Sequence, residues 1–337
     1  MVLAALFLQF SHPNLAAAQI VPSSSSFASQ LSHIRSVAIS QAKMLGVIQS
    51  NEIFAKTDGR MISLRFVSQS KGVNAGVIFM DCSFDGKQTP CELDTGSGRN
   101  ITVLNNDFFN RYPVIGHAKT GGMSGGLQSV DIIQISDFRV DSIPFGSQRI
   151  EREARSRCDN GLSAPVIGWV ALASRSLELS FSDKNPHAII DGRLPRGIFP
   201  FKFSMDKDIL LPAKVSGQET TAMFDTGAGL TVIDENIIAN HPENFMFVEE
   251  YPASDINCQT AQTKIYKAKS IEIGNRQFSN VYVLAMDFRF IQGILKLPDL
   301  HLIIGTNMIT QADWSFDFVH KRWSVAAPSQ EMKTSLE

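Results

Sequence analysis

Two short segments of the sequence carry residue types that could do chemistry together. Asp94 lies in "ELDTGSGRNITVL", and Asp225 lies in "MFDTGAGLTVI". In both segments the aspartate is followed by Thr, Gly, a small residue, a second Gly and then an apolar run. Taken alone, each Asp-Thr-Gly triplet is compatible with an ordinary turn, because Asp caps turns and Gly adopts positive φ angles.

Both segments belong to a longer internal repeat. "AGVIFMDCSFDGKQTPCELDTGSGRNITVL" aligns with "DILLPAKVSGQETTAMFDTGAGLTVI", and in each copy a glycine (Gly86 or Gly217) precedes the aspartate by eight positions (94−86 and 225−217). Upstream, "MISLRF" matches "FPFKF", and downstream "APVIGWVALASRSLELSFS" resembles "LHLIIGTNMITQADWSFDF". Two triplets in matched contexts are very rare by chance, so the chain contains two copies of one module.

Duplicated aspartates can meet across a pseudo-twofold axis, and this arrangement has a definite chemistry. Two carboxyl groups at close range cannot both ionise comfortably, so the pair holds one proton between them. The ionised member can take a proton from a bound water while the protonated member donates to a substrate carbonyl. This is general acid–base hydrolysis without a covalent intermediate.

The residues after each aspartate have a physical role in this interpretation. Thr95 and Thr226 are expected to donate their hydroxyl groups across the axis and lock the two loops together. Gly96 and Gly227 are expected to present backbone N–H groups to the carboxylates, and a side chain at either position would crowd the pair.

Three further features concern how the loops are supported and how they differ. Gly168 and Gly305 follow their aspartates by 74 and 80 residues (168−94 and 305−225). Each is expected to let a chain pass close behind its loop. Ser97 can hydrogen-bond Asp94 whereas Ala228 cannot do so for Asp225, so the two aspartates are expected to differ. The motif does not indicate which one is the base.

With these motifs the chain resembles the aspartic proteases. "DTGSG" and "DTGAG" fit the active-site loops of that family, and "VIG" and "IIG" fit its later apolar-apolar-Gly element. The resemblance covers Met61 to Val325 and implies a single-chain, two-lobed member with lobes similar to the retroviral branch. It further implies peptide-bond hydrolysis by Asp94 and Asp225, no metal or other cofactor, inhibition by pepstatin-type compounds, and a hairpin flap over the cleft.

The expected fold is all-β, with two homologous β-barrel-like lobes of the acid protease fold related by a pseudo-twofold axis. Short β-branched and aromatic segments separated by Gly, Asn, Asp and Pro support it. The N-terminal lobe is placed at residues 61–190 and the C-terminal lobe at 196–326, joined by "NPHAIIDGRLPRG". The charged stretch "RIEREARSR" at 149–157 is expected to be solvated.

The flap is expected in "HAKTGGMSGGLQSVDIIQI", where Gly122, Met123, Ser124 and Gly125 form the glycine-rich tip of a hairpin. "GMSGG" also matches the G-x-S-x-G nucleophile elbow of serine hydrolases. That motif requires a preceding strand and a following helix, and the segment after it has the alternation of an extended strand instead.

The N-terminal region is predicted to be a targeting and linking segment. Residues 1–18 resemble a signal peptide that lacks its positive region, and residues 19–60 form a Ser-rich linker with a short helical or pro-segment. A buried N-terminal strand or helix is the alternative. Cys82 and Cys91 flank a hairpin turn and are able to form a disulfide, whereas Cys158 and Cys258 have no evident partner.

Composition limits the partners. The formal net charge is −2, with no basic excess to bind a phosphate backbone, so nucleic acid is not expected. No apolar run reaches the roughly 20 residues of a membrane helix. We therefore expect a secreted or periplasmic monomer that acts on peptides or proteins. The alternative is a catalytically silent relative that binds peptides or serves as a scaffold.

Overall fold

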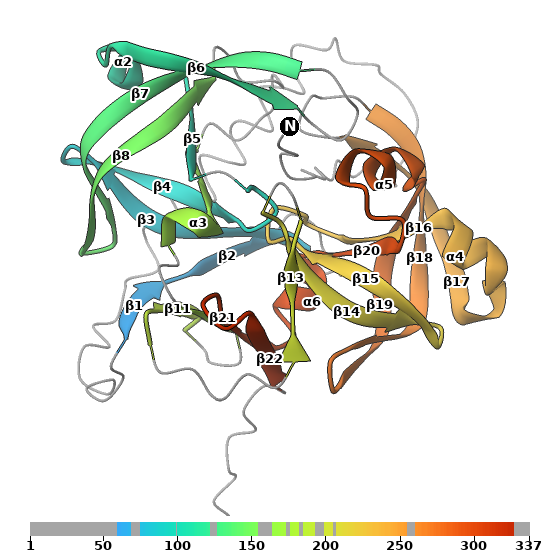
Figure 1. The fold of residues 1–337 in the computed structure, drawn as a ribbon. Helices are drawn as coiled ribbons and strands as arrows, with labels where there is room; N and C mark the ends of the chain where they lie inside the picture. Colours follow the sequence, from blue (N-terminus) through green and yellow to red (C-terminus); the bar gives the residue numbers. More distant parts are fainter. Residues whose placement is uncertain are drawn as a thin grey trace, which may run out of the picture.

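The molecule is built mainly from β-strands that form three sheets (Figure 1). The predicted all-β, two-lobed fold is confirmed. The computed structural model describes residues 59–68, 75–98, 100–121, 127–153, 164–172, 176–181, 185–192, 199–204, 207–254 and 260–326. The predicted signal peptide and nearly all of the linker with its helical segment lie outside these residues.

The first lobe is a closed barrel. Its eight-stranded sheet has the order β2-β3-β4-β9-β5-β8-β7-β6, and a further pairing of β3 with β7 closes the six inner strands into a ring. The order by residues is β2 (Arg65–Ser68), β3 (Gly76–Phe84), β4 (Lys87–Asp94), β9 (Val166–Gly168), β5 (Ile101–Leu104), β8 (Ile143–Glu153), β7 (Leu127–Val140) and β6 (Val114–Gly121).

The second lobe repeats this topology strand for strand. Its order is β13-β14-β15-β20-β16-β19-β18-β17, and β14 pairs with β18 to close the ring. The parallel pairs β4–β9 and β5–β8 of the first lobe correspond to β15–β20 and β16–β19. The strands are β13 (Lys202–Phe203), β14 (Ile209–Val215), β15 (Gln218–Phe224), β20 (Leu300–Ile304), β16 (Thr231–Asp234), β19 (Arg276–Met286), β18 (Thr260–Ile273) and β17 (Phe245–Ser254).

A third sheet joins the lobes. It has the order β1 (Arg60–Ser63), β11 (His187–Ile190), β10 (Ser176–Ser180), β21 (Asp313–Asp317), β22 (Arg322–Ala326) and β12 (Phe199–Pro200). The lobes meet where β10 pairs with β21, with Leu177 opposite Phe316. The segment "NPHAIIDGRLPRG" is therefore more than a connection, because β11 lies within it and pairs with both β1 and β10.

Helices are short in the described part of the chain. They are α2 (Asp107–Asn110), α3 (Trp169–Leu172), α4 (Glu235–Asn240), α5 (Arg289–Leu295), α6 (Thr306–Ile309) and the 3₁₀ turn η1 (Pro242–Asn244). Within the described ranges, no helix has the length and apolarity needed to cross a membrane.

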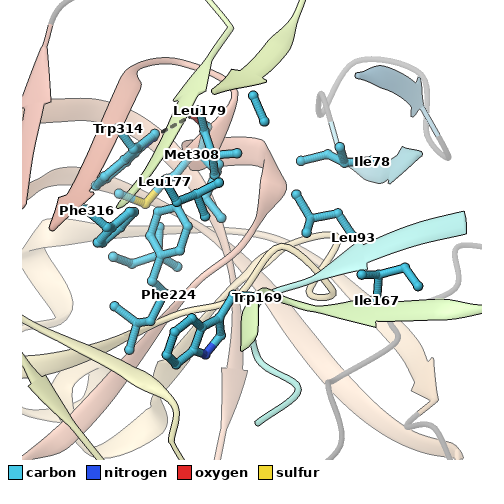
Figure 2. Packing of buried hydrophobic residues seen from close by; sticks show 14 of the residues in the cluster. Ile78, Leu93, Ile167, Trp169, Leu177, Leu179, Phe224, Met308, Trp314 and Phe316 are labelled. Carbon is cyan, nitrogen blue, oxygen red and sulfur yellow. Dashed lines mark hydrogen bonds between the residues drawn. The ribbon is translucent and has the colours of Figure 1, made fainter. Parts of the chain in front are cut away.

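The hydrophobic core extends through both lobes and the sheet between them. Strand alternation turns Leu93, Ile167 and Phe224 into this core, part of which is seen from close by in Figure 2. Phe224 packs edge-on against Trp314 and Phe316 of β21, with ring centroids 4.9 and 5.0 Å apart. One continuous cluster therefore supports the ends of β4 and β15, the strands that lead to the two aspartates.

Matching hairpins precede the two aspartates. Asp85 and Gly86 connect β3 to β4 with positive φ angles of 45° and 84°, and Ser216 and Gly217 connect β14 to β15 with 53° and 81°. Positive φ at both central residues is the type I′ pattern, which matches the twist of tight hairpins. Because the two turns are alike, each aspartate follows its turn glycine by the same number of residues along the strand.

The first of these hairpins also carries a disulfide. Cys82 of β3 is bonded to Cys91 of β4, with their Cα atoms 5.8 Å apart. The two are diagonal neighbours, because Cys82 lies opposite Thr89 in the strand register. The bridge that the sequence allowed between Cys82 and Cys91 is therefore present, whereas Cys158 and Cys258 lie outside the described residues.

Candidate active site

The two Asp-Thr-Gly loops lie at the ends of equivalent strands and meet between the lobes. Asp94 is the last residue of β4, and Asp225 follows directly after β15. Because side chains alternate along a strand, the residues before them point into the barrels and the aspartates point away. Asp94 is 1% exposed and Asp225 is 2% exposed. The structure therefore brings together two carboxyl groups that lie 131 residues apart in the sequence (225−94).

The threonines next to the aspartates bind the two loops together. The backbone N–H of Thr95 donates to the hydroxyl of Thr226, and the backbone N–H of Thr226 donates to the hydroxyl of Thr95, each at 2.9 Å. Each hydroxyl then donates to a carbonyl of the opposite lobe, Thr95 to Phe224 at 3.1 Å and Thr226 to Leu93 at 2.8 Å. The expected hydroxyl contacts across the axis are present.

The glycines after the threonines lie directly against the carboxyl groups. A Cβ atom added to Gly96 would be 2.4 Å from Cγ of Asp225, a distance that no side chain can occupy. The backbone N–H of Gly227 donates to Oδ1 of Asp225 at 2.8 Å. Gly96 therefore acts on the aspartate of the opposite lobe, a relationship that sequence alone did not indicate.

Gly168 and Gly305 lie behind the loops as expected. Gly168 is the register partner of Asp94, and its N–H donates to the carbonyl of Asn100 at 2.9 Å. A Cβ added to Gly305 would be 2.4 Å from the carbonyl carbon of Leu230, so the chain can pass there only because Gly305 has no side chain.

The residue after each of these glycines reaches the opposite lobe. Nε1 of Trp169 donates to the carbonyl of Lys207 at 3.1 Å, and the indole stacks on Phe203 and Phe318. The hydroxyl of Thr306 donates to the carbonyl of Gly76 at 2.9 Å. Equivalent positions of the two lobes thus both contact the opposite lobe. The contact from the first lobe is made by an indole ring and the contact from the second by a hydroxyl group.

The electrostatics of the two aspartates are unequal. Burial raises the pKa of Asp94 well above its ordinary value of 3.8, and the negative charges of Asp225 and Glu92 raise it further. Burial also raises the pKa of Asp225, to about 6. The two carboxyl groups are hydrogen-bonded to each other, which raises the pKa of Asp94 and lowers that of Asp225. Burial and the neighbouring negative charges therefore favour the protonated form of Asp94.

Backbone donors favour the ionised form of Asp225. The N–H groups of Gly227, Ala228 and Gly96 all lower its pKa against the effect of burial. For Asp94, the N–H of Ser97 acts in the same direction. Ser97 and Ala228 therefore both contribute a backbone N–H group to the aspartate of their own loop.

Glu92 was not identified from the sequence as part of the site. It is fully buried, two residues before Asp94, where the second copy of the repeat has Met223. The sequence signal that could have identified Glu92 is the difference between the two copies of the repeat, which have a charged residue in one and an apolar residue in the other at this position.

The predicted flap residues Gly122, Met123, Ser124 and Gly125 lie outside the described residues. The strands on either side, β6 and β7, form an antiparallel pair from Val114 to Gly121 and from Leu127 to Ile133. β6 and β7 are thus the two strands of a hairpin, and the predicted flap residues lie between them in the sequence. A serine nucleophile elbow requires a helix after the motif, whereas the element that follows here is the strand β7.

Comparison with known proteins addresses the second lobe. No curated protein matches the chain. Residues 211–308, from β14 to α6 and including Asp225, match the family model described as "Aspartyl protease". This match supports an aspartyl protease family for the protein and, with it, a hydrolase of the protease type.

Proposed function

We propose that this protein is an aspartic endopeptidase that hydrolyses peptide bonds with Asp94 and Asp225 as its acid–base pair. The observation that carries the proposal is the meeting of two buried, mutually hydrogen-bonded aspartates at the junction of two barrels of identical topology. Buried like charges are costly to keep, which favours catalysis over a silent scaffold.

The unequal pair assigns a role to each carboxyl group. Asp225, the more acidic member, takes a proton from a water molecule that attacks the peptide carbonyl carbon. Asp94 donates its proton to the carbonyl oxygen as the tetrahedral intermediate forms. Within the described residues, Oδ1 of Asp94 has no hydrogen-bond partner, so this buried oxygen is available to a bound ligand.

A single chain supplies both halves of the proposed site. The family match covers most of the second lobe. We include the first lobe in the proposed site because it has the same strand order and its own Asp-Thr-Gly loop. Because no second copy is needed to complete the pair, we propose that the monomer is the active form and that peptides or proteins are the substrates.

We further propose that the protein is exported, to the periplasm or outside the cell. The disulfide between Cys82 and Cys91 supports this, because such bonds persist in oxidising compartments. N-terminal sequencing of the mature protein tests it. Cleavage near residue 18 is expected, and a retained N-terminus on cytoplasmic protein would contradict export.

The proposed activity is tested with peptide substrates. Asp94→Asn and Asp225→Asn should each abolish cleavage, and pepstatin should inhibit the wild type. Asp107→Asn, at an exposed carboxyl group at the start of α2, is the matched control and should leave activity unchanged. Undiminished cleavage by the Asp94 variant would refute the assignment, and inhibition by a fluorophosphonate alone would point to a serine hydrolase.

A further inference from the structure

A third buried carboxyl group lies beside the aspartate pair. Glu92 and Asp94 are two residues apart on β4, so their side chains leave the same face of the sheet. Glu92 is 0% exposed. In the strand register, Glu92 lies opposite Phe79 of β3 and Val166 of β9. Two residues further along the same strands, Asp94 lies opposite Gly168. The acid–base chemistry proposed above does not use Glu92.

The second lobe has an apolar side chain at the equivalent position. Met223 lies two residues before Asp225, and its register partners are Leu210 of β14 and Ile303 of β20. All three side chains belong to one buried hydrophobic cluster. The strands that lead to the two aspartates therefore have matching pairing, and one carries a carboxyl group where the other carries a thioether, two residues before the aspartate.

The described strands place further charged groups on this face. Arg65 of β2 and Asp81 of β3 form an ion pair of 2.6 Å, and the side chain of Asp81 is 54% exposed. Glu151 of β8 lies on the same face, because the register runs from Glu92 through Val166 and Thr102 to Glu151. β8 is the third strand from β4 in the sheet. Asp94 is the charged neighbour on the same strand. The negative charge of Glu92 accordingly raises the pKa of Asp94, after burial and the charge of Asp225.

We propose that Glu92 is a positioning residue for the shared proton: it holds the proton on Asp94 and so leaves Asp225 as the base. The inference rests on the proposed function, because it concerns the same aspartate pair. Without Glu92, the two carboxyl groups would compete for the proton on more equal terms. With it, the proton has one preferred site before substrate binds.

The direct test is a pH titration of the aspartate carboxyl groups by ¹³C NMR in the full chain. In Glu92→Gln, the midpoint for Asp94 should move to lower pH, because the ionised form loses a repelling neighbour. Glu92→Met, which has the side chain used in the second lobe, should give the same shift and guards against misfolding of the first variant. An unmoved midpoint would overturn the inference, whether or not the protein cleaves peptides.

A kinetic test separates this inference from the proposed function. On the alkaline side of the pH profile, kcat/KM of Glu92→Gln should fall roughly threefold to tenfold below that of the wild type. The acid limb, set by Asp225, should stay in place. Glu92→Asp should restore the wild-type profile, and Asp81→Asn, an exposed charge on the same face, should not alter it.

Each result has a distinct meaning. If the wild type cleaves peptides and Asp94→Asn is inactive, but the alkaline limb of Glu92→Gln is unmoved, the role of Glu92 is wrong and the protease assignment stands. If the wild type is inactive while the NMR midpoint shifts, the protease assignment fails and the control of the Asp94 proton by Glu92 stands.

Discussion

Thr95 and Thr226 exchange equal hydrogen bonds across the boundary between the lobes. Each hydroxyl accepts from the backbone N–H of the other at 2.9 Å and donates to a carbonyl that lies just before the opposite aspartate. Both residues are 0% exposed. The separation of the two carboxyl groups is therefore set by four buried hydrogen bonds that depend on both lobes.

Thr226→Val should damage this linkage while keeping the shape of the side chain. It leaves the N–H of Thr95 and the carbonyl of Leu93 buried without their partner, at a cost of about 2–5 kcal/mol in the free energy of unfolding. Urea unfolding measures the loss, and peptide cleavage should fall with it. Thr226→Ser keeps the hydroxyl and should lose much less. Equal stability of the Val and Ser variants would contradict the account.

Gly96→Ala should disturb the aspartate of the other lobe. Its methyl group would be placed 2.4 Å from the carboxyl carbon of Asp225, so the loops must separate or the carboxyl group must rotate. We expect cleavage to fall by about 100-fold or more, since small misplacements of reacting groups are costly. Gly293→Ala is the matched control: a Cβ there contacts nothing within 4 Å, and alanine should stabilise α5 by up to about 1 kcal/mol. Full activity of Gly96→Ala would refute the contact.

Asp225→Asn should stabilise the protein at neutral pH. The pKa of Asp225 is about 6 in the folded state against an ordinary value of 3.8. A raised pKa means that its contribution to stability is complete below about pH 4 and is lost as the pH rises towards 6. Removing the ionisable group should therefore restore on the order of 3 kcal/mol at pH 8 and little at pH 4. Thermal melting at both pH values measures this, and destabilisation at pH 8 would contradict it.

The pH profile of cleavage should rise through about pH 6. The proposed mechanism needs Asp225 ionised, with a pKa of about 6, and Asp94 protonated, with a pKa raised well above 3.8. The profile of kcat/KM should therefore be bell-shaped, with its acid limb near pH 6 and its alkaline limb set by Asp94. An optimum at pH 3 to 4 would show that the two aspartates are less perturbed than the buried site requires.

The repeat predicted much of the fold and the meeting of the two Asp-Thr-Gly loops. Paired motifs such as "DTGSG" and "DTGAG" are short-range patterns, and their equal spacing from Gly86 and Gly217 reflects equal hairpins in the structure. The cross-axis hydrogen bonds of the threonines followed from the symmetry alone. Local sequence and duplication were sufficient for these features because each copy folds by the same local rules.

Features that depend on tertiary contacts were not predicted. The charged stretch at 149–157 was expected to be solvated, yet Arg152 on β8 is 8% exposed. Its guanidinium donates to the carbonyl groups of Phe109 and Tyr112 and to Asp131 of β7. Those acceptors come from distant segments, so no local pattern indicates them. The burial of Glu92 and the strand pairing of β11 likewise depend on closure of the barrel and docking of the lobes.

The difference between Glu92 and Met223 has a consequence for how such a molecule can be assembled. In a protease made of two identical chains, any residue beside the axis occurs twice, so a carboxyl group next to one aspartate must also stand next to the other. Joining the copies in one chain removes this constraint, since each half can be altered alone. This protein has retained the symmetric frame of barrels, hairpins and threonines while giving one half an electrostatic environment that a symmetric dimer cannot have.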